Sequence, residues 1–167
     1  KRFGDVFANK NINLSVKKGE VHTLLGENGA GKSTLMNILC GLYQPTSGEI
    51  YLEGKKVKID SPRTAVKMGI GMVHQHFMLV EAMTVFENII LGTSKDKSIF
   101  IKKDALKKEI QELADSYGMD VELDKEITEI SVGAQQRVEI LKALYRGAEL
   151  LILDEPTAAL TDTEVIG

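Results

Sequence analysis

The chain has 167 residues, of which 43% are hydrophobic and 27% are charged. This composition is typical of one soluble globular domain and excludes disordered, collagen-like and coiled-coil classes. The 21 Lys and Arg residues stand against 24 Asp and Glu residues, for a net charge of -3, so no general attraction to nucleic acid or anionic lipid is expected.

The first half of the chain predicts strands, a loop, a helix and a hairpin. Residues 11–17 alternate apolar with polar side chains and predict a half-buried strand, and the apolar run 21–25 predicts a buried strand. A glycine-bearing loop over 26–31 then leads into apolar residues at helical spacing, which predict a helix over 32–40. Alternation returns over 50–59 around a glycine-containing turn, which predicts a hairpin.

The second half predicts helices that alternate with short strands. The expected elements are a helix from Pro62 capped by Ser61, a strand over 70–73, helical structure over 84–117, a helix from Ser131 to about Tyr145 and a strand over 150–153. Strands that alternate with helices imply an α/β fold in which a parallel sheet carries a helical insertion.

The strongest motif is the glycine-rich loop that lies between a predicted strand and a predicted helix. Its glycines allow backbone N–H groups to surround an anion, and the helix N-terminus adds its positive dipole end. Lys32 is then expected to reach the β and γ phosphates of a nucleotide, and the Ser33 hydroxyl to ligate Mg²⁺. The motif comprises Gly26, Glu27, Asn28, Gly29, Ala30, Gly31, Lys32, Ser33 and Thr34.

A second motif is the pair of acids that ends the apolar strand 150–153. In a nucleotide-binding sheet, a carboxylate at the end of a buried strand can hold the Mg²⁺ shell, and a second one beside it can activate water. Asp154 suits the first role and Glu155 suits the second. The pair is a common feature of strand ends by itself, and the phosphate loop makes the catalytic interpretation persuasive.

A third motif, at Ser131 and Gly133, is a helix start suited to an anion. Two helix N-termini of one fold cannot easily meet at the same γ-phosphate. A second protomer is therefore expected to supply this helix start.

Four motifs of this chain resemble those of the ATP-binding subunit of an ABC transporter. They lie, in chain order, at 26–34, Gln75, 131–137 and 150–157. The resemblance covers essentially the whole chain. It implies a P-loop NTPase fold with a RecA-like core, a small antiparallel β subdomain and a helical subdomain over about 76–145. It also implies that the fold is truncated at both ends, since the first strand and the region after the D-loop at 158–161 are missing.

The resemblance implies a role for each candidate residue. The ligands of ATP are Phe3, which stacks on adenine, the phosphate loop Gly26, Glu27, Asn28, Gly29, Ala30, Gly31, Lys32, Ser33 and Thr34, and Ser131, Gly133 and Gln135. Mg²⁺ is expected on Ser33, Gln75 and Asp154, and catalysis on Glu155, Lys32 and Gln75. Phe3 also has a plain alternative role as a terminal core residue.

Departures from the general family pattern narrow the resemblance. Val132 and Ala134 occupy the first-glycine and glutamine places of the signature, and the D-loop ends in Thr161. Those choices resemble importers of simple sugars and nucleosides whose ATPase carries two such domains in one polypeptide, and residues 72–80 resemble the nucleoside branch more than the ribose or galactose branch.

The resemblance implies partners and a location as well. The partners are a second ATP-binding domain, in the same polypeptide or a homodimer, membrane permease subunits and, indirectly, a substrate-binding lipoprotein, with no nucleic acid. The location is peripheral, on the cytoplasmic face of the cell membrane.

Other functions remain open from the sequence. A small-molecule P-loop kinase would share residues 26–34, and a soluble ABC ATPase or a regulatory ATP-binding domain would share every motif. His74 and His76 stand at strand spacing, but a metal site of structural type needs about four ligands. Cys40 is most simply a small core residue.

Overall fold

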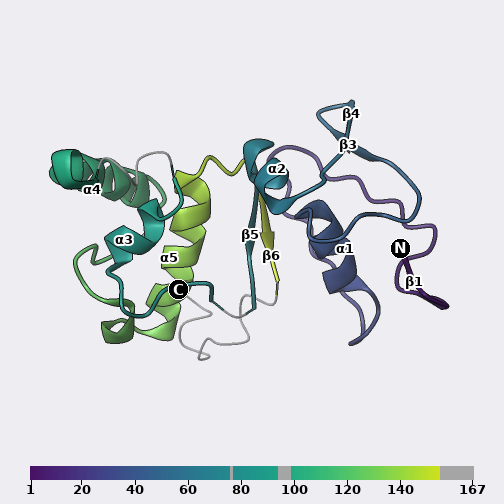
Figure 1. Cartoon of the computed structure of the whole chain (residues 1–167), viewed down its shortest axis with the longest axis horizontal. Coiled ribbons are helices and arrows are strands. Elements are labelled where there is room, and N and C mark those ends of the chain that lie inside the picture. Colours follow the sequence, from purple (N-terminus) through teal and green to yellow (C-terminus); the bar gives the residue numbers. More distant parts are fainter. Residues whose placement is uncertain (76, 94–98, 155–167) are drawn as a thin grey trace. The chain divides into compact units, whose positions relative to one another are not determined.

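The structure is a computed structural model that describes residues 1–75, 77–93 and 99–154; of residues 99–102 it describes the backbone alone (Figure 1). The chain divides into two compact units. The first runs from Lys1 to Met68 and the second begins at Gly69.

The first unit contains two antiparallel hairpins. Strand β1 (Arg2–Phe3) pairs with β2 (Val6–Phe7), and β3 (Ile50–Leu52) pairs with β4 (Lys55–Val57). The turn of the second hairpin places Glu53 and Gly54 at φ 50° and 75°, as a two-residue turn compatible with the strand twist requires. The hairpin predicted over 50–59 is confirmed.

Two helices complete the first unit. Helix α1 (Lys32–Leu39) follows the glycine-rich loop, and α2 (Pro62–Lys67) follows Ser61. The Ser61 hydroxyl accepts a hydrogen bond from the Thr64 amide at 3.2 Å, which satisfies one of the first-turn amides. Both predicted helix starts are confirmed.

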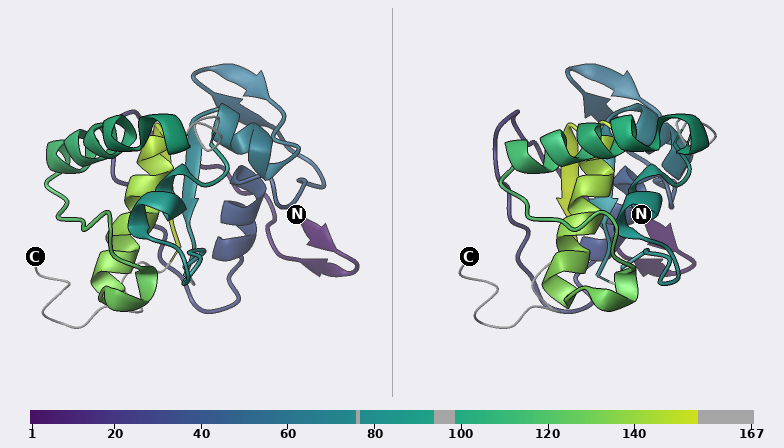
Figure 2. Two further views of the ribbon diagram at one scale, coloured as in Figure 1. Left: turned by 60° about the vertical axis from the view of Figure 1, so that its left-hand side comes forward. Right: turned by 90° about the vertical axis from the view of Figure 1, so that its left-hand side faces the viewer.

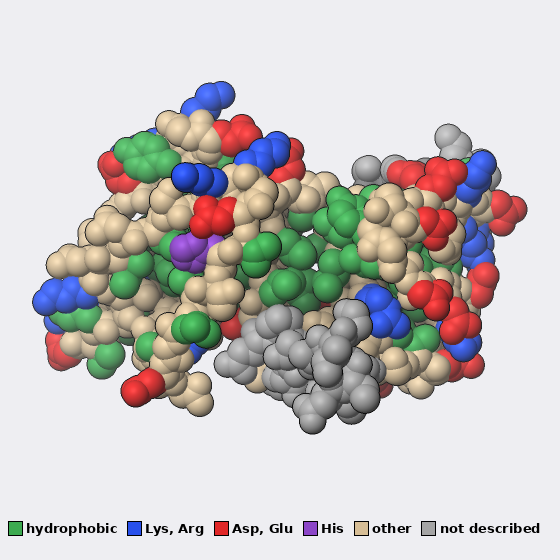
Figure 3. Space-filling view, turned by 180° about the vertical axis from the view of Figure 1, so that it is seen from behind, with side chains coloured by type: hydrophobic (Ala, Val, Ile, Leu, Met, Phe, Trp, Pro, Cys, Tyr) green, Lys and Arg blue, Asp and Glu red, His purple; other side chains and the backbone are tan. Residues whose placement is uncertain are grey.

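The strands predicted over 11–17 and 21–25 are wrong, since neither segment forms regular structure. The side chains of Val21 and Leu25 are 95% and 91% exposed, and hydrophobic side chains reach the surface of this unit in Figure 3, on the left. A strand exists by pairing, and no strand among residues 1–68 runs beside either segment. Apolar alternation alone was therefore not enough to form a strand.

The second unit contains the parallel pair that the sequence predicts. Strand β5 (Ile70–Val73) pairs with β6 (Leu150–Leu153) in parallel, so that Ile70 lies opposite Leu150 and Val73 opposite Leu153. Figure 1 shows the two strands side by side. The carboxyl ends of both strands therefore meet at one edge.

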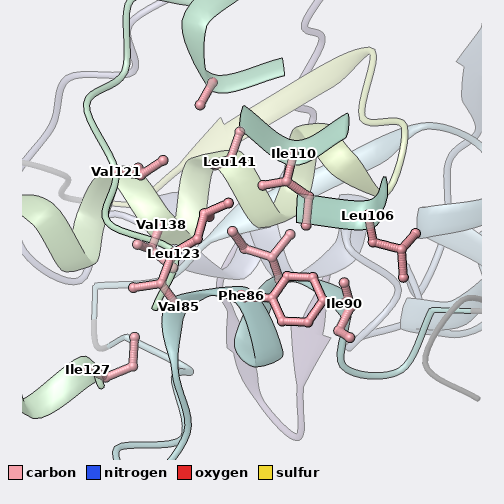
Figure 4. Close-up of a cluster of buried hydrophobic side chains, with 12 residues drawn as sticks. Val85, Phe86, Ile90, Leu106, Ile110, Val121, Leu123, Ile127, Val138 and Leu141 are labelled. Atoms are coloured by element: carbon pink, nitrogen blue, oxygen red, sulfur yellow. The ribbon is translucent and has the colours of Figure 1, made fainter. Parts of the chain in front are cut away.

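Helices build the core of the second unit. They are α3 (Val85–Ile90), α4 (Ile99–Ser116), the 3₁₀ turn η2 (Ile127–Glu129) and α5 (Val132–Tyr145). Both α3 and α4 pack against α5, and α4 crosses α5 in both views of Figure 2. In Figure 4 the ring of Phe86, which is fully buried, lies beside Ile90 within the apolar cluster.

The charged helix α4 carries paired side chains. Lys107 contacts Asp124, and Lys108 lies 3.8 Å from Glu112. Acidic and basic side chains are interspersed on the second unit in Figure 3, on the right.

Among the helices of residues 1–75, 77–93 and 99–154, none has both the length and the apolar character needed to cross a bilayer.

Candidate functional site

The glycine-rich loop ends in a helix start that no side chain caps. Gly29 and Gly31 have φ values of 84° and 89°, a left-handed conformation that favours glycine. Gly31 is the N-cap of α1 and offers its first turn no side-chain acceptor, whereas the hydroxyls of Ser61, Thr84 and Ser131 cap their helices. The first-turn amides of α1 are thus suited to an anion such as a phosphate.

Lys32 folds back over the same loop. Its Nζ donates hydrogen bonds to the carbonyl oxygens of Gly26, at 2.6 Å, and Glu27, at 3.0 Å. The ammonium group is therefore at the mouth of the loop, where a phosphate bound by the loop amides would meet it. The neighbouring Ser33 is exposed, so its hydroxyl is accessible to a metal ion on such a phosphate.

The segment Ala8–Asn9 contacts the loop, a contact that no sequence motif predicted. The Asn9 side chain donates from Nδ2 to the Gly31 carbonyl at 3.0 Å. A Cβ atom at Gly31 would lie 2.2 Å from the Ala8 carbonyl oxygen, so only glycine fits. An asparagine just after a hairpin carries no motif, and only the fold reveals this contact.

Phe3 lies on the hairpin that precedes this segment. The Lys1 carbonyl accepts hydrogen bonds from the amides of Ala8 and Asn9, at 3.0 and 3.1 Å, which closes the hairpin against the Asn9 segment. The Phe3 ring is 42% exposed and meets Tyr43 edge to face, with centroids 5.4 Å apart. It is therefore not a buried core residue, and its exposed part can take a stacked ring.

Two candidate metal ligands lie at the shared edge of the parallel strands. Asp154 follows β6, and its backbone amide donates to the carbonyl of Val73, the last residue of β5, at 3.0 Å. Gln75 lies two residues beyond Val73 and is exposed. Both residues belong to the second unit, and the glycine-rich loop belongs to the first.

Residues 1–75, 77–93 and 99–154 contain no group of three or more His, Cys, Asp or Glu side chains that could hold a metal alone. The predicted ligands are the Ser33 hydroxyl in the first unit and the Gln75 carboxamide and Asp154 carboxylate in the second. Each offers an oxygen donor, which suits Mg²⁺, an ion usually held by one or two carboxylates together with substrate phosphates. His76, Glu155 and the predicted D-loop at 158–161 lie outside the described residues.

The signature residues form the capped start of α5. The Ser131 hydroxyl accepts from the Ala134 amide at 3.2 Å, and Gly133 is buried. The Gln135 side chain turns back and donates to the carbonyls of Ile127 and Ile130, at 3.2 and 3.4 Å. Of the three predicted nucleotide ligands Ser131, Gly133 and Gln135, only Ser131 is exposed.

Three polar side chains that the sequence did not single out hold the segment after Gln75. Glu139 accepts from the Met78 amide at 2.7 Å, and Lys142 donates to the Met78 carbonyl at 2.8 Å. Asn88 holds Val80 in the same way, accepting from its amide at 2.7 Å and donating to its carbonyl at 3.1 Å. A usable signal was the charged pair three residues apart on α5, in which Glu139 directly follows Val138 and Lys142 directly follows Leu141.

Burial affects the charge of Lys142. Desolvation lowers the pKa of the Lys142 ammonium, and the neighbouring Glu139 carboxylate partly offsets that effect. Both residues are almost fully buried, at 6% and 8% exposure for Glu139 and Lys142. The two side chains lie 3.5 Å apart, so each buried charge has an opposite charge beside it.

Comparisons with known proteins show the family of the chain. The sequence profile of the ABC transporter family matches residues 9–158. The chain is 62% identical over 165 residues to the nucleoside import ATP-binding protein NupA of Lactococcus lactis subsp. cremoris and 59% identical over 165 residues to the guanosine import ATP-binding protein NupO of Bacillus subtilis. Each match covers 99% of the chain, which spans about a third of each relative, 33% and 32%.

A solved structure agrees as well. The fold is similar to a dimeric ATP-binding cassette in a post-hydrolysis state bound to ADP and phosphate, with a TM-score of 0.74 and 30% identity. The match covers 98% of this chain and 73% of that one.

Proposed function

The chain belongs to the ABC transporter family, and from that membership we propose that it binds and hydrolyses ATP to drive uptake of a nucleoside through a partner membrane permease. One observation carries the substrate class: over nearly its whole length the chain is 62% identical to a nucleoside import ATP-binding protein and 59% identical to a guanosine import ATP-binding protein. The phosphate loop and its uncapped helix support the ATP part of the proposal.

The loop and Lys32 would hold the phosphates of ATP. Amides at the start of α1 would donate to the β and γ phosphate oxygens, and Lys32 would exchange its carbonyl partners for phosphate. This ammonium would then neutralise negative charge that develops on the transferred phosphoryl group. The exposed Phe3 ring would stack on adenine.

Mg²⁺ would be held by Ser33, Gln75 and Asp154. When bound, this ion supplies a Lewis acid that neutralises phosphate charge. Glu155, next to Asp154 in the sequence, would accept the proton of the attacking water.

A second ATP-binding domain would complete the site. Its Ser131, Gly133 and Gln135 would close over the γ-phosphate, so ATP binding would assemble the pair and hydrolysis would release it. The second domain could lie in the same polypeptide or in a second copy. The pair would sit on the cytoplasmic face of the membrane, against permease subunits that receive the substrate from a lipoprotein.

Reconstitution of the intact protein with its permease tests this function. We expect ATP turnover to rise when a nucleoside and its binding protein are added, and ribose to give no rise. Lys32→Ala is the inactive control. Stimulation by ribose alone would replace the nucleoside with a simple sugar, and turnover that ignores the permease would contradict the transport role.

A further inference from the structure

The segment after Gln75 is held through its backbone by side chains of two helices. Residues 78 and 80 lie outside every strand, yet both groups of each backbone unit, N–H and C=O, find partners. Glu139 and Lys142 of α5 form hydrogen bonds with the backbone of Met78, and Asn88 of α3 forms hydrogen bonds with the backbone of Val80. We call these three side chains the clamp.

The clamp imitates a neighbouring strand. In an antiparallel sheet, alternate residues give both their N–H and their C=O to the same partner residue. Here side chains take the place of the partner residue. The Glu139 carboxylate and the Lys142 ammonium bind the N–H and the C=O of Met78, and the Asn88 carboxamide binds both groups of Val80. The spacing of two residues matches that pairing pattern, so the clamp fixes the segment at two successive points.

Stability alone explains the clamp poorly. Met78 itself is 66% exposed and Val80 is 40% exposed, so the segment lies at the surface although its four hydrogen bonds to the clamp are partly buried. A buried ion pair, by contrast, loses hydration, and apolar replacements of such pairs are often neutral or stabilising. Asn88 is fully buried. Two buried charges and a buried carboxamide, which also donates to the carbonyls of Met83 and Thr84, therefore fix the course of an exposed segment.

The clamp also joins two parts of the proposed machinery. Glu139 and Lys142 lie on the helix that Ser131 begins, and Met78 lies three residues after Gln75. We propose that Glu139, Lys142 and Asn88 are positioning residues that link α5 to Gln75; this inference rests on the proposed function. A displacement of the Ser131 end of α5 would then move the segment after Gln75 with it.

The test uses the intact protein with its permease. In the double variant Glu139→Leu with Lys142→Met, apolar side chains of similar volume replace the pair, and thermal unfolding reports whether the fold is kept. The control is the corresponding change in the exposed pair of α4, Lys108→Met with Glu112→Leu. Glu139→Gln keeps an acceptor for the Met78 amide and serves as the conservative variant.

Two readouts separate positioning from structure. Hydrogen exchange of the Met78 amide should speed up about tenfold or more in the double variant, because this amide loses its charge-assisted partner, while the Val80 amide keeps Asn88. ATP affinity should stay within about twofold, since the phosphate loop keeps its contacts, while permease-stimulated turnover should fall about tenfold. The α4 control should keep both values near wild type. Glu139→Gln keeps an acceptor for the Met78 amide but leaves the Lys142 ammonium without an opposite charge, so both values should fall between wild type and the double variant.

Other outcomes overturn the proposal. Unchanged exchange would mean that the clamp does not hold the segment, and faster exchange with unchanged turnover would reduce it to a structural feature. A wild-type protein without transport-coupled turnover would instead contradict the proposed function and the positioning role with it, while exchange would still report whether the clamp holds.

Discussion

The backbone amide of Asp154 donates a 3.0 Å hydrogen bond to the carbonyl of Val73. This bond extends the parallel pairing of β5 with β6 by one residue beyond the strand ends. The start of the Gln75 segment and the acidic end of β6 are therefore fixed to each other through the backbone. The Asp154 side chain takes no part in that bond, which leaves its carboxylate for a metal ion.

Removing the Asp154 carboxylate is expected to separate metal binding from folding. In Asp154→Ala the amide still pairs with Val73, so the thermal midpoint should stay close to wild type. Mg²⁺-dependent ATP turnover should fall about 100-fold or more, because the ion loses its carboxylate ligand. Turnover is measured over a Mg²⁺ series, and ATP binding in EDTA should be unchanged. Asp104→Ala, an exposed change on α4, is the control, and a normal Mg²⁺ response in Asp154→Ala would contradict the assignment.

Lys32→Ala is expected to remove nucleotide binding and leave the fold intact. Among the described residues, its Nζ donates to two exposed loop carbonyls, so little folding free energy depends on these contacts. Charge-assisted hydrogen bonds from Lys32 to phosphate are stronger than its bonds to neutral carbonyls. Their loss should lower ATP affinity about 100-fold. Calorimetric titration with ATP measures this effect beside Lys55→Ala, an exposed lysine of β4. Undiminished affinity would contradict the phosphate-loop assignment.

Asn9→Asp is expected to loosen the phosphate loop. The substitution keeps the side chain's shape but places an oxygen where Nδ2 now donates to the Gly31 carbonyl at 3.0 Å. One lost hydrogen bond and a new repulsion should weaken ATP binding about tenfold. Asn13→Asp adds the same charge at an exposed site, and equal losses in the two variants would trace the effect to charge alone.

Local chemistry made part of the fold predictable. Ser61 and Ser131 cap the helices that their sequences predict, and the turn at Glu53 and Gly54 forms as expected. The strands predicted over 11–17 and 21–25 do not form, because a strand depends on a partner that is not local in sequence. The Glu139 contact with Met78 spans 61 residues, so no spacing rule could reveal it, whereas the phosphate-loop motif is contiguous.

The Lys107–Asp124 ion pair predicts a pH effect on the second unit. The hydrogen bond from Lys107 is the largest cause that lowers the pKa of Asp124. Because the folded pKa lies below the unfolded one, the pair favours folding above the unfolded pKa, and that contribution is lost as pH falls through the folded pKa. NMR titration of the Asp124 carboxyl should show a higher midpoint in Lys107→Ala and no change in Lys108→Ala. An unchanged midpoint in Lys107→Ala would show that the pair does not persist in solution.

The crowded surroundings of Gly71 in β5 allow a steric test of how closely the strand packs against its neighbours. A Cβ atom there would lie 2.8 Å from the Ala148 Cβ and 3.2 Å from the Ala143 Cβ, closer than packed carbon atoms allow. Gly71→Ala should therefore lower the free energy of unfolding by about 1–3 kcal/mol, as measured by urea unfolding.

Ala148→Gly removes the nearer of those two atoms and provides the matched rescue. In an Ala148→Gly background, Gly71→Ala should destabilise less than in the wild type, since the added methyl group then has room. The double-mutant cycle measures that difference, and it should exceed the few tenths of a kcal/mol typical of independent sites, about 0.3–0.5 kcal/mol. Strictly additive effects would show that β5 does not lie this close to the Ala148 segment, and that the strand is spaced further from its neighbours.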